Sequence, residues 1–166
     1  PLLSPRPDRA WRGRVEGCTR DAWAAAERHA YAPAPELNPQ RVVWELSRRL
    51  PNHAIVTADS GSAAVWLARD VRLRRGMLAS LSGGLATMGC AIPYATAAKF
   101  AHDARVAVAL VGDGAMQMSG INALIDVAKH WRRWRDPRLV VLVLNNRDLN
   151  YVTWEQRVME GEPKFG

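Results

Sequence analysis

Two stretches decide the fold, RVAVALVGDGA at residues 105–115 and LVVLVLNNRD at residues 139–148. Each opens with a continuous run of Val, Ala and Leu, which is typical of a strand buried on both faces of a parallel sheet. The first run ends in Gly112-Asp113-Gly114, and the second ends in Asn145-Asn146 after a spacer of 30 residues, 115 to 144. We therefore expect two buried strands, at 105–111 and 139–144, that carry polar residues on their carboxyl ends.

The residues around these strands alternate between strand and helix patterns. AIVTA at 54–58 predicts a further strand, residues 63–70 a helix, and residues 88–102 a longer Ala-rich helix with Pro93 in its first turn or at a kink. Between the two decisive strands, Gly114 leads into a helix from Met116, and a 3.6-residue spacing marks one apolar helix face. That face comprises Ile121, Leu124, Ile125, Ala128 and Trp131. The alternation predicts an α/β fold, an open, doubly wound parallel sheet with helices on both faces.

The N-terminal part of the chain differs in composition. Residues 1–19 are rich in Pro, Arg and Gly without a clear period, 19–29 favour a short helix, and AYAPAPELNP is a Pro-rich linker. Asn38-Pro39 is typical of a helix start, with the helix reaching about Leu50. We expect residues 1–37 to be the tail of a preceding domain plus a linker, and 38–166 to form the main domain.

Composition narrows the class of protein. The 166 residues with 48% hydrophobic content suffice for one domain with a sizeable core. No apolar run is long enough for a membrane span, and two isolated cysteines indicate a reducing, cytoplasmic setting. The net charge of +7 permits a nucleic-acid partner, but the Arg clusters are scattered and lack interleaved aromatic residues. A basic nucleic-acid-binding domain is therefore a weak alternative, and no nucleic-acid partner is expected.

The strand ends carry the chemistry. Three loops, Asp59–Ala63, Gly112–Gln117 and Asn145–Asp148, should meet at the carboxyl edge of the sheet, where open α/β sheets bind ligands. A Gly-rich turn that leads into a helix presents N–H groups to a phosphate. Asp113 and an Asn side chain supply the oxygen ligands that Mg²⁺ prefers, with diphosphate oxygens completing its coordination. Taken singly, each motif is also compatible with an ordinary turn.

Together the motifs resemble the signature of thiamine diphosphate (ThDP) enzymes, in particular their diphosphate-binding domain. SLSGGLATMGCAIPYATAAK (80–99) and TADSGSAAVW (57–66) are similar to segments of the acetolactate synthase and pyruvate oxidase branch, and NNRDLNYVTWEQR (145–157) is most similar to pyruvate oxidases. The resemblance covers about residues 38–166. The family's domain continues with further sheet elements, so the chain is expected to be C-terminally incomplete, as a fragment or a separate subunit.

The resemblance implies roles for individual residues. Asp113, the side chain of Asn146 and the backbone carbonyl of Asp148 would bind Mg²⁺. Met88 would hold ThDP in its bent shape, and the Ala86 carbonyl would accept a hydrogen bond from the cofactor's amino group. Ala86 stands where Gly is common, which is harmless if only its backbone is used. The diphosphate would contact residues of two glycine-containing loops, namely Ser60, Gly61, Ser62, Gly112, Gly114 and Ala115.

Tyr151 and Glu155 match positions that line the substrate pocket of pyruvate oxidases, although a surface helix would also explain them. The implied activity is decarboxylation of a 2-oxo acid such as pyruvate, either oxidase-like or, alternatively, acetolactate synthase-like. FAD could bind in a missing middle domain. The catalytic glutamate of the family lies in a pyrimidine-binding domain of the same or another subunit, so this chain alone is expected to be inactive and to work in a homo-oligomer. A non-catalytic cofactor-binding subunit is the alternative of a different class.

Overall fold

The structure is a computed structural model of the chain, and it describes residues 8–159 and 161. Its centre is a parallel four-stranded sheet in the order β2-β1-β3-β4. The strands are β1 (Ile55–Ala58), β2 (Leu78–Leu81), β3 (Ala107–Gly112) and β4 (Leu139–Leu144). In the register of β3 and β4, Gly112 pairs with Leu144, so the loops that follow both strands begin side by side.

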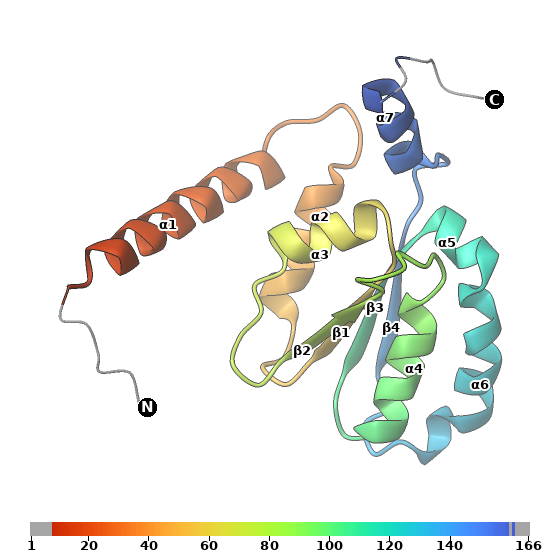
Figure 1. Cartoon of the computed structure of the whole chain (residues 1–166). Coiled ribbons are helices and arrows are strands. Elements are labelled where there is room, and N and C mark those ends of the chain that lie inside the picture. Colours follow the sequence, from red (N-terminus) through yellow and green to blue (C-terminus); the bar gives the residue numbers. More distant parts are fainter. Residues whose placement is uncertain (1–7, 160, 162–166) are drawn as a thin grey trace.

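Helices cover both faces of the sheet, as Figure 1 shows. On one face lie α2 (Pro39–Arg49) and α3 (Ser62–Asp70), and their core includes Val43, Leu67, Val56 and Leu110. On the other face lie α4 (Ala91–Ala101) and α6 (Ala123–His130), where Ile92 packs against Ala109 and Val111. The expected doubly wound α/β fold is confirmed.

Short elements connect these layers. α5 (Asp113–Met118) follows β3 directly, the 3₁₀ turn η1 (Gly120–Asn122) leads into α6, and η2 (Trp131–Arg133) follows it. After β4 the chain forms α7 (Asn150–Met159). None of the helices in the described ranges is long and apolar enough to cross a membrane.

α1 (Ala10–Ala30) is longer than the helix expected at 19–29. No Pro interrupts residues 10–30, and Gly13 and Gly17 lower helix propensity without ending the helix. Only its C-terminal part packs on the body, where Ala26 and Ala30 contact Trp44 of α2. The remainder projects away from the sheet (Figure 1). The part of the N-terminal expectation that concerns residues 1–7 lies outside the described residues.

Other expectations need correction at their boundaries. β2 was not predicted, because its sequence LASL is short and exposed throughout and so carries no burial pattern. α4 begins at Ala91 instead of Met88, with Pro93 in its first turn as predicted, and α5 begins at Asp113 instead of Met116.

Two predicted burial patterns also differ from the structure. Val140 and Val143 of β4 are exposed, because β4 has no neighbour on its outer side within the described residues. On the apolar face predicted between the two decisive strands, Ile121 and Ile125 are exposed and Leu124 is only partly buried.

Candidate functional site

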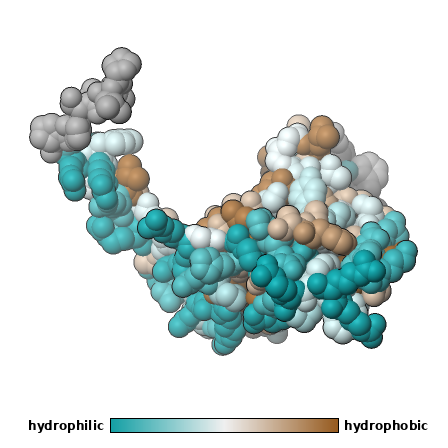
Figure 2. All heavy atoms as spheres, turned by 90° about the horizontal axis from the view of Figure 1, so that it is seen from below, coloured by the Kyte–Doolittle hydropathy of each residue, from teal (hydrophilic) through white to brown (hydrophobic). Residues whose placement is uncertain are grey.

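The site forms where the strand order reverses. From β1 the chain crosses to β2 on one side, and from β2 it crosses back over β1 to β3 on the other. The loops after β1 and β3 therefore diverge at the carboxyl edge of the sheet and leave a crevice between them, which is where open α/β sheets bind ligands. The opposite, amino-terminal edge is mostly hydrophilic (Figure 2).

The loop after β1 carries Ser60, Gly61 and Ser62. Gly61 has φ +82° and ψ −147°, a conformation that essentially only glycine adopts, and it directly precedes α3. The Ser60 hydroxyl donates a hydrogen bond to the Thr87 carbonyl at 3.2 Å. The turn thus brings small polar side chains and the N-terminus of a nine-residue helix to the crevice.

At the carboxyl end of β3, Gly112, Asp113 and Gly114 form the turn from the strand into α5. Asp113 is the first residue of α5, and no hydrogen bond or ion pair with another described residue engages its carboxylate. A Cβ added to Gly114 would lie 2.7 Å from Leu149 Cδ2 and 3.4 Å from Met88 Cε. A side chain at this position would therefore displace the Leu149 tip and crowd Met88 at the cavity wall. The Gly114 backbone faces the crevice next to a free carboxylate, as a phosphate-metal pair requires.

The loop after β4 is held by two side-chain turns. Asn145 Oδ1 accepts a hydrogen bond from the N–H of Arg147 at 3.0 Å, and Asn146 Oδ1 accepts one from the N–H of Asp148 at 3.1 Å. Arg147 takes up the bend with φ +55°. A carbonyl oxygen has two lone pairs, so Asn146 Oδ1 keeps acceptor capacity for a cation. The hydrogen bond from the Asp148 N–H fixes the orientation of the Asn146 side chain.

The loop between β2 and α4 supplies Ala86 and Met88. Ala86 has φ +49°, in the left-handed region where a Cβ is unfavourable. The Cβ of Ala86 therefore strains the backbone, whereas the expectation that alanine leaves the role of the backbone carbonyl intact stays a prediction. Cys90, which follows in the same loop, is buried, and burial raises the pKa of its thiol, with the nearby Asp59 charge acting in the same direction.

α7 lies beyond the carboxyl edge of the sheet (Figure 1). Its residues Tyr151 and Glu155 line the same cavity as the loops after β1 and β3. The Tyr151 Cβ lies 3.9 Å from the position that a Cβ on Gly61 would take. Both residues are exposed to solvent, Tyr151 by 46%. α7 therefore forms an open outer wall of the crevice.

One cavity of about 390 Å³ collects all the site residues that the sequence predicts. Nothing in the structure assigns them roles, but it does bring them together. The cavity wall includes Ser60, Gly61, Ser62, Ala86, Met88, Gly112, Asp113, Gly114, Ala115, Asn146, Asp148, Tyr151 and Glu155.

The donors of this cavity fit a magnesium ion that binds together with phosphate oxygens. Within the described residues, no cluster of three or more His, Cys, Asp or Glu side chains could hold a metal. Mg²⁺ commonly binds through one or two carboxylates plus substrate phosphates, which is the arrangement that Asp113 and Asn146 allow. Apolar side chains, among them Met88 and Leu149, line the same cavity, as the organic part of a cofactor requires.

Sequence reasoning missed several lining residues, among them Pro39, Trp66, Leu149 and Val152. These are apolar side chains from α2, α3 and the start of α7. Three of them lie inside the quoted motifs, but their residue type alone does not mark them as lining residues. Asp59 was placed in a candidate loop but given no role. A signal was present, because an acidic residue directly after a buried strand and before a glycine loop has to be paired or capped.

The chain was compared with known proteins. Residues 59–166 match the family described as "Thiamine pyrophosphate enzyme, C-terminal TPP binding domain". The YdaP protein of Bacillus subtilis, described as thiamine pyrophosphate-containing, is 32% identical over 136 residues, which is 82% of this chain and 23% of that protein.

Two acetolactate synthases are also similar. The Bacillus subtilis enzyme is 29% identical over 119 residues, which is 72% of this chain and 20% of that protein. The large subunit of the Lactococcus lactis enzyme is 27% identical over 140 residues, which is 78% of this chain and 23% of the subunit. The chain thus spans about a fifth to a quarter of the length of these relatives.

Proposed function

The chain belongs to the thiamine pyrophosphate enzymes through their C-terminal TPP-binding domain, and from this premise we propose that it binds ThDP with Mg²⁺ in an enzyme that decarboxylates a 2-oxo acid. The observation that carries the proposal is the single cavity that joins both glycine loops, Asp113, Asn146 and Met88. When bound, ThDP would supply the carbanion that attacks the keto group and the electron sink that makes decarboxylation possible.

The residues of this chain would bind and orient the cofactor. Asp113, the side chain of Asn146 and the Asp148 carbonyl would hold Mg²⁺, and the backbone of the Gly61 and Gly114 turns would contact the diphosphate. Met88 would press against the cofactor between its two rings, while the Ala86 carbonyl would accept a hydrogen bond from its amino group. Each of these groups belongs to the wall of the same cavity.

Tyr151 and Glu155 would contact the 2-oxo acid from α7. Both lie in the outer wall of the cavity, where a small substrate would enter. Their hydroxyl and carboxylate could orient the substrate's polar groups and move a proton in the subsequent step. The reaction's acceptor would be decided by parts of the enzyme beyond this chain, including a pyrimidine-binding domain of the same or another subunit in an oligomer.

A pyruvate oxidase-like reaction and an acetolactate synthase-like carboligation both start with this decarboxylation. The segment NNRDLNYVTWEQR favours the first, and the similarity to acetolactate synthases favours the second. The products separate them, because an oxidase consumes an electron acceptor, whereas a carboligase forms a longer oxo-hydroxy acid. Assaying the natural assembly with pyruvate, with and without a quinone or flavin acceptor, distinguishes the two reactions.

Calorimetry of ThDP binding to the natural assembly tests the proposed cofactor. Asp113→Ala removes the anionic Mg²⁺ ligand, and we expect ThDP affinity to fall by at least about 100-fold, since an uncompensated metal-diphosphate charge loses several kcal/mol. Asp126→Ala is the matched control, because Asp126 is exposed on α6 outside the cavity. Unchanged affinity in Asp113→Ala would show that the metal ligand is assigned wrongly. Failure of the unsubstituted assembly to bind ThDP would refute the proposed cofactor.

A further inference from the structure

Asp59 is a completely buried carboxylate at the carboxyl end of β1, directly before the Ser60 loop. Its Oδ1 accepts hydrogen bonds from three successive backbone N–H groups, those of Gly89 (2.6 Å), Cys90 (2.7 Å) and Ala91 (3.3 Å). Its Oδ2 has no hydrogen-bond partner among the described residues. The three N–H groups open α4, where backbone donors lack partners within the helix. Asp59 therefore caps α4 from a different element of the fold.

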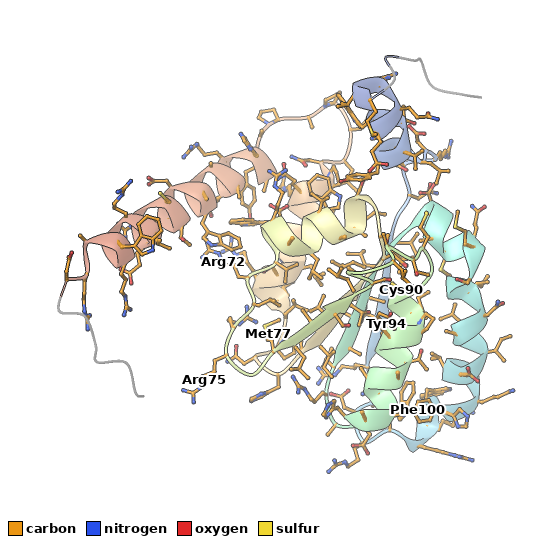
Figure 3. The ribbon with its side chains drawn as sticks, viewed as in Figure 1. Arg72, Arg75, Met77, Cys90, Tyr94 and Phe100 are labelled. Carbon is orange, nitrogen blue, oxygen red and sulfur yellow. The ribbon has the colours of Figure 1, made fainter. Side chains whose placement is uncertain are left out.

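The capped segment is the one that carries Met88. Thr57 Oγ1 donates to the Ala91 carbonyl at 2.7 Å, and Ser119 Oγ donates to the Met88 carbonyl itself at 3.3 Å. Gly89 has φ +95°, and a Cβ on it would lie 2.0 Å from Ser119 Oγ. The main chain on both sides of Met88 is thus fixed. The thiol of Cys90, which is labelled in Figure 3, donates to the carbonyl of Ala58 at 3.6 Å, so this segment meets the end of β1.

The charge of Asp59 suits this position. A buried carboxylate is costly unless hydrogen bonds compensate it, and three N–H donors at a helix start offset that cost while the helix dipole favours a negative charge. A serine or threonine hydroxyl reaches one such donor at a helix start, so it could not hold the three consecutive residues in the same way. The buried charge of Asp59 thus holds residues 89–91 in a fixed position relative to β1.

Asp59 also adjoins the other half of the cavity. Ser60, Gly61 and Ser62 follow it without a break, and Ser60 is tied to Thr87, the residue before Met88. In the proposed function, the first loop contacts the diphosphate, and Met88 contacts the cofactor between its rings. Asp59 thus joins the main chain of both contacts, alongside the weaker tie from Ser60 to Thr87.

We infer that Asp59 is a positioning residue, which holds Met88 at a fixed place relative to the diphosphate loop and so sets the shape in which the cofactor binds. This inference rests on the proposed function for its consequence, but the clamp itself exists without a cofactor. Asp59 does not line the cavity, so it acts through Met88 and the loop and not by touching ligand.

Amide hydrogen exchange in the cofactor-free natural assembly tests the clamp first. Asp59→Asn keeps the shape and one acceptor oxygen but loses the charge, and Asp59→Ala loses both. Because a hydrogen bond to a charged group is worth about 1.5–3 kcal/mol, we expect the amides of residues 89–91 to exchange roughly 10- to 100-fold faster in Asp59→Asn. The amides of β3 serve as an internal reference and should stay protected.

ThDP binding then tests the consequence. We expect Asp59→Asn to slow hydrogen–deuterium exchange at C2 of bound ThDP by about tenfold or more, whereas its effect on ThDP affinity should stay below about threefold. The ¹³C-methyl resonance of Met88 should shift or broaden in the same variant before any cofactor is added. A merely structural defect would instead lower affinity, C2 exchange and β3 protection together.

Asp70→Asn is the matched control. Asp70 is also completely buried, and its Oδ2 has no hydrogen-bond partner in the part of the chain that the structure describes, but it ends α3, away from Met88. It should leave the exchange of residues 89–91 and the Met88 methyl resonance unchanged. Unaltered exchange in both Asp59 variants, or the same change in Asp70→Asn, would overturn the inference. An assembly that binds no ThDP would instead refute the proposed function, whatever the exchange of residues 89–91 shows.

Discussion

Ala86 shows how one residue of the site combines strain with a backbone role. Its φ of +49° places the Cβ against the following carbonyl, a conformation that costs an alanine about 1–2 kcal/mol relative to a right-handed one. The loop nevertheless fixes this conformation, since the Ala86 N–H donates to the Ser82 carbonyl at 3.0 Å and the Thr87 N–H to Ser82 Oγ at 3.1 Å. The strain therefore directs a backbone carbonyl, which is the group that the proposed function uses.

The effect of a substitution at Ala86 on the free energy of unfolding should depend on how well the new residue tolerates a positive φ. Ala86→Gly relieves the Cβ contact but gains unfolded-state entropy, so we expect the free energy of unfolding to change by less than about 0.5 kcal/mol. Ala86→Val should lose about 2 kcal/mol, because β-branched residues rarely adopt positive φ. Urea unfolding measures both. Ala97→Gly, in an exposed position of α4, should lose about 1 kcal/mol. If Ala86→Gly and Ala97→Gly lower the free energy of unfolding equally, the Ala86 backbone is not strained.

At the scale of elements, α4 is held at both ends by buried charges. Asp59 binds its start, and Lys99 near its end is completely buried. Lys99 Nζ donates to the carbonyls of Asp103 (3.1 Å), Arg105 (2.6 Å) and Asp136, and lies 5.4 Å from the ring centroid of Trp134. Burial lowers the pKa of Lys99, while the nearby Asp136 carboxylate opposes that shift.

Lys99→Met should therefore destabilise the fold strongly. The substitution keeps the apolar stem but leaves three carbonyls in a largely buried position without their donor, so we expect a loss of about 3 kcal/mol in the free energy of unfolding. Lys129→Met on exposed α6 is the control and should change it by less than about 0.5 kcal/mol. Thermal and urea unfolding measure both variants. A loss near the control value would mean that solvent satisfies these carbonyls.

Elements with their own local signal were the ones the sequence could predict. β1, β3 and β4 are apolar runs, and α2 has Asn38 as N-cap, whose side chain accepts from the Gln40 N–H. β2 was missed because its four residues are all exposed and gain their order from pairing with β1. The buried charges of Asp59 and Lys99 were missed for a related reason. Their partners are backbone groups, which residue type does not reveal, and some of these, such as Gly89 and Asp136, lie far away in the sequence.

At the scale of the whole molecule, the helical layer formed by α4, η1 and α6 is only partly covered by other described residues. Three apolar residues each expose more than half of their surface to solvent, namely Phe100, Ile121 on η1 and Ile125 on α6. Phe100 lies at the lower end of α4 in Figure 3. The sequence predicted an apolar face there but not its exposure, because periodicity tells which residues share a face and not whether a neighbour covers it. The convergence of the site was predictable for a different reason, since parallel strands bring their carboxyl-end loops together whatever their separation in the sequence.

This exposed layer should make the 166-residue chain self-associate in isolation. Burying two isoleucine side chains contributes about 1.5–3 kcal/mol each, so Ile121→Lys with Ile125→Lys should lower the association constant by at least about tenfold. Sedimentation velocity over a range of concentrations measures it, and urea unfolding checks that the fold persists. Leu73→Lys with Leu85→Lys is the matched control, because these leucines are at least as exposed but lie outside α4 and α6. If the control pair lowers association equally, the effect comes from added charge, and the α4–α6 layer is not the contact that holds the copies together.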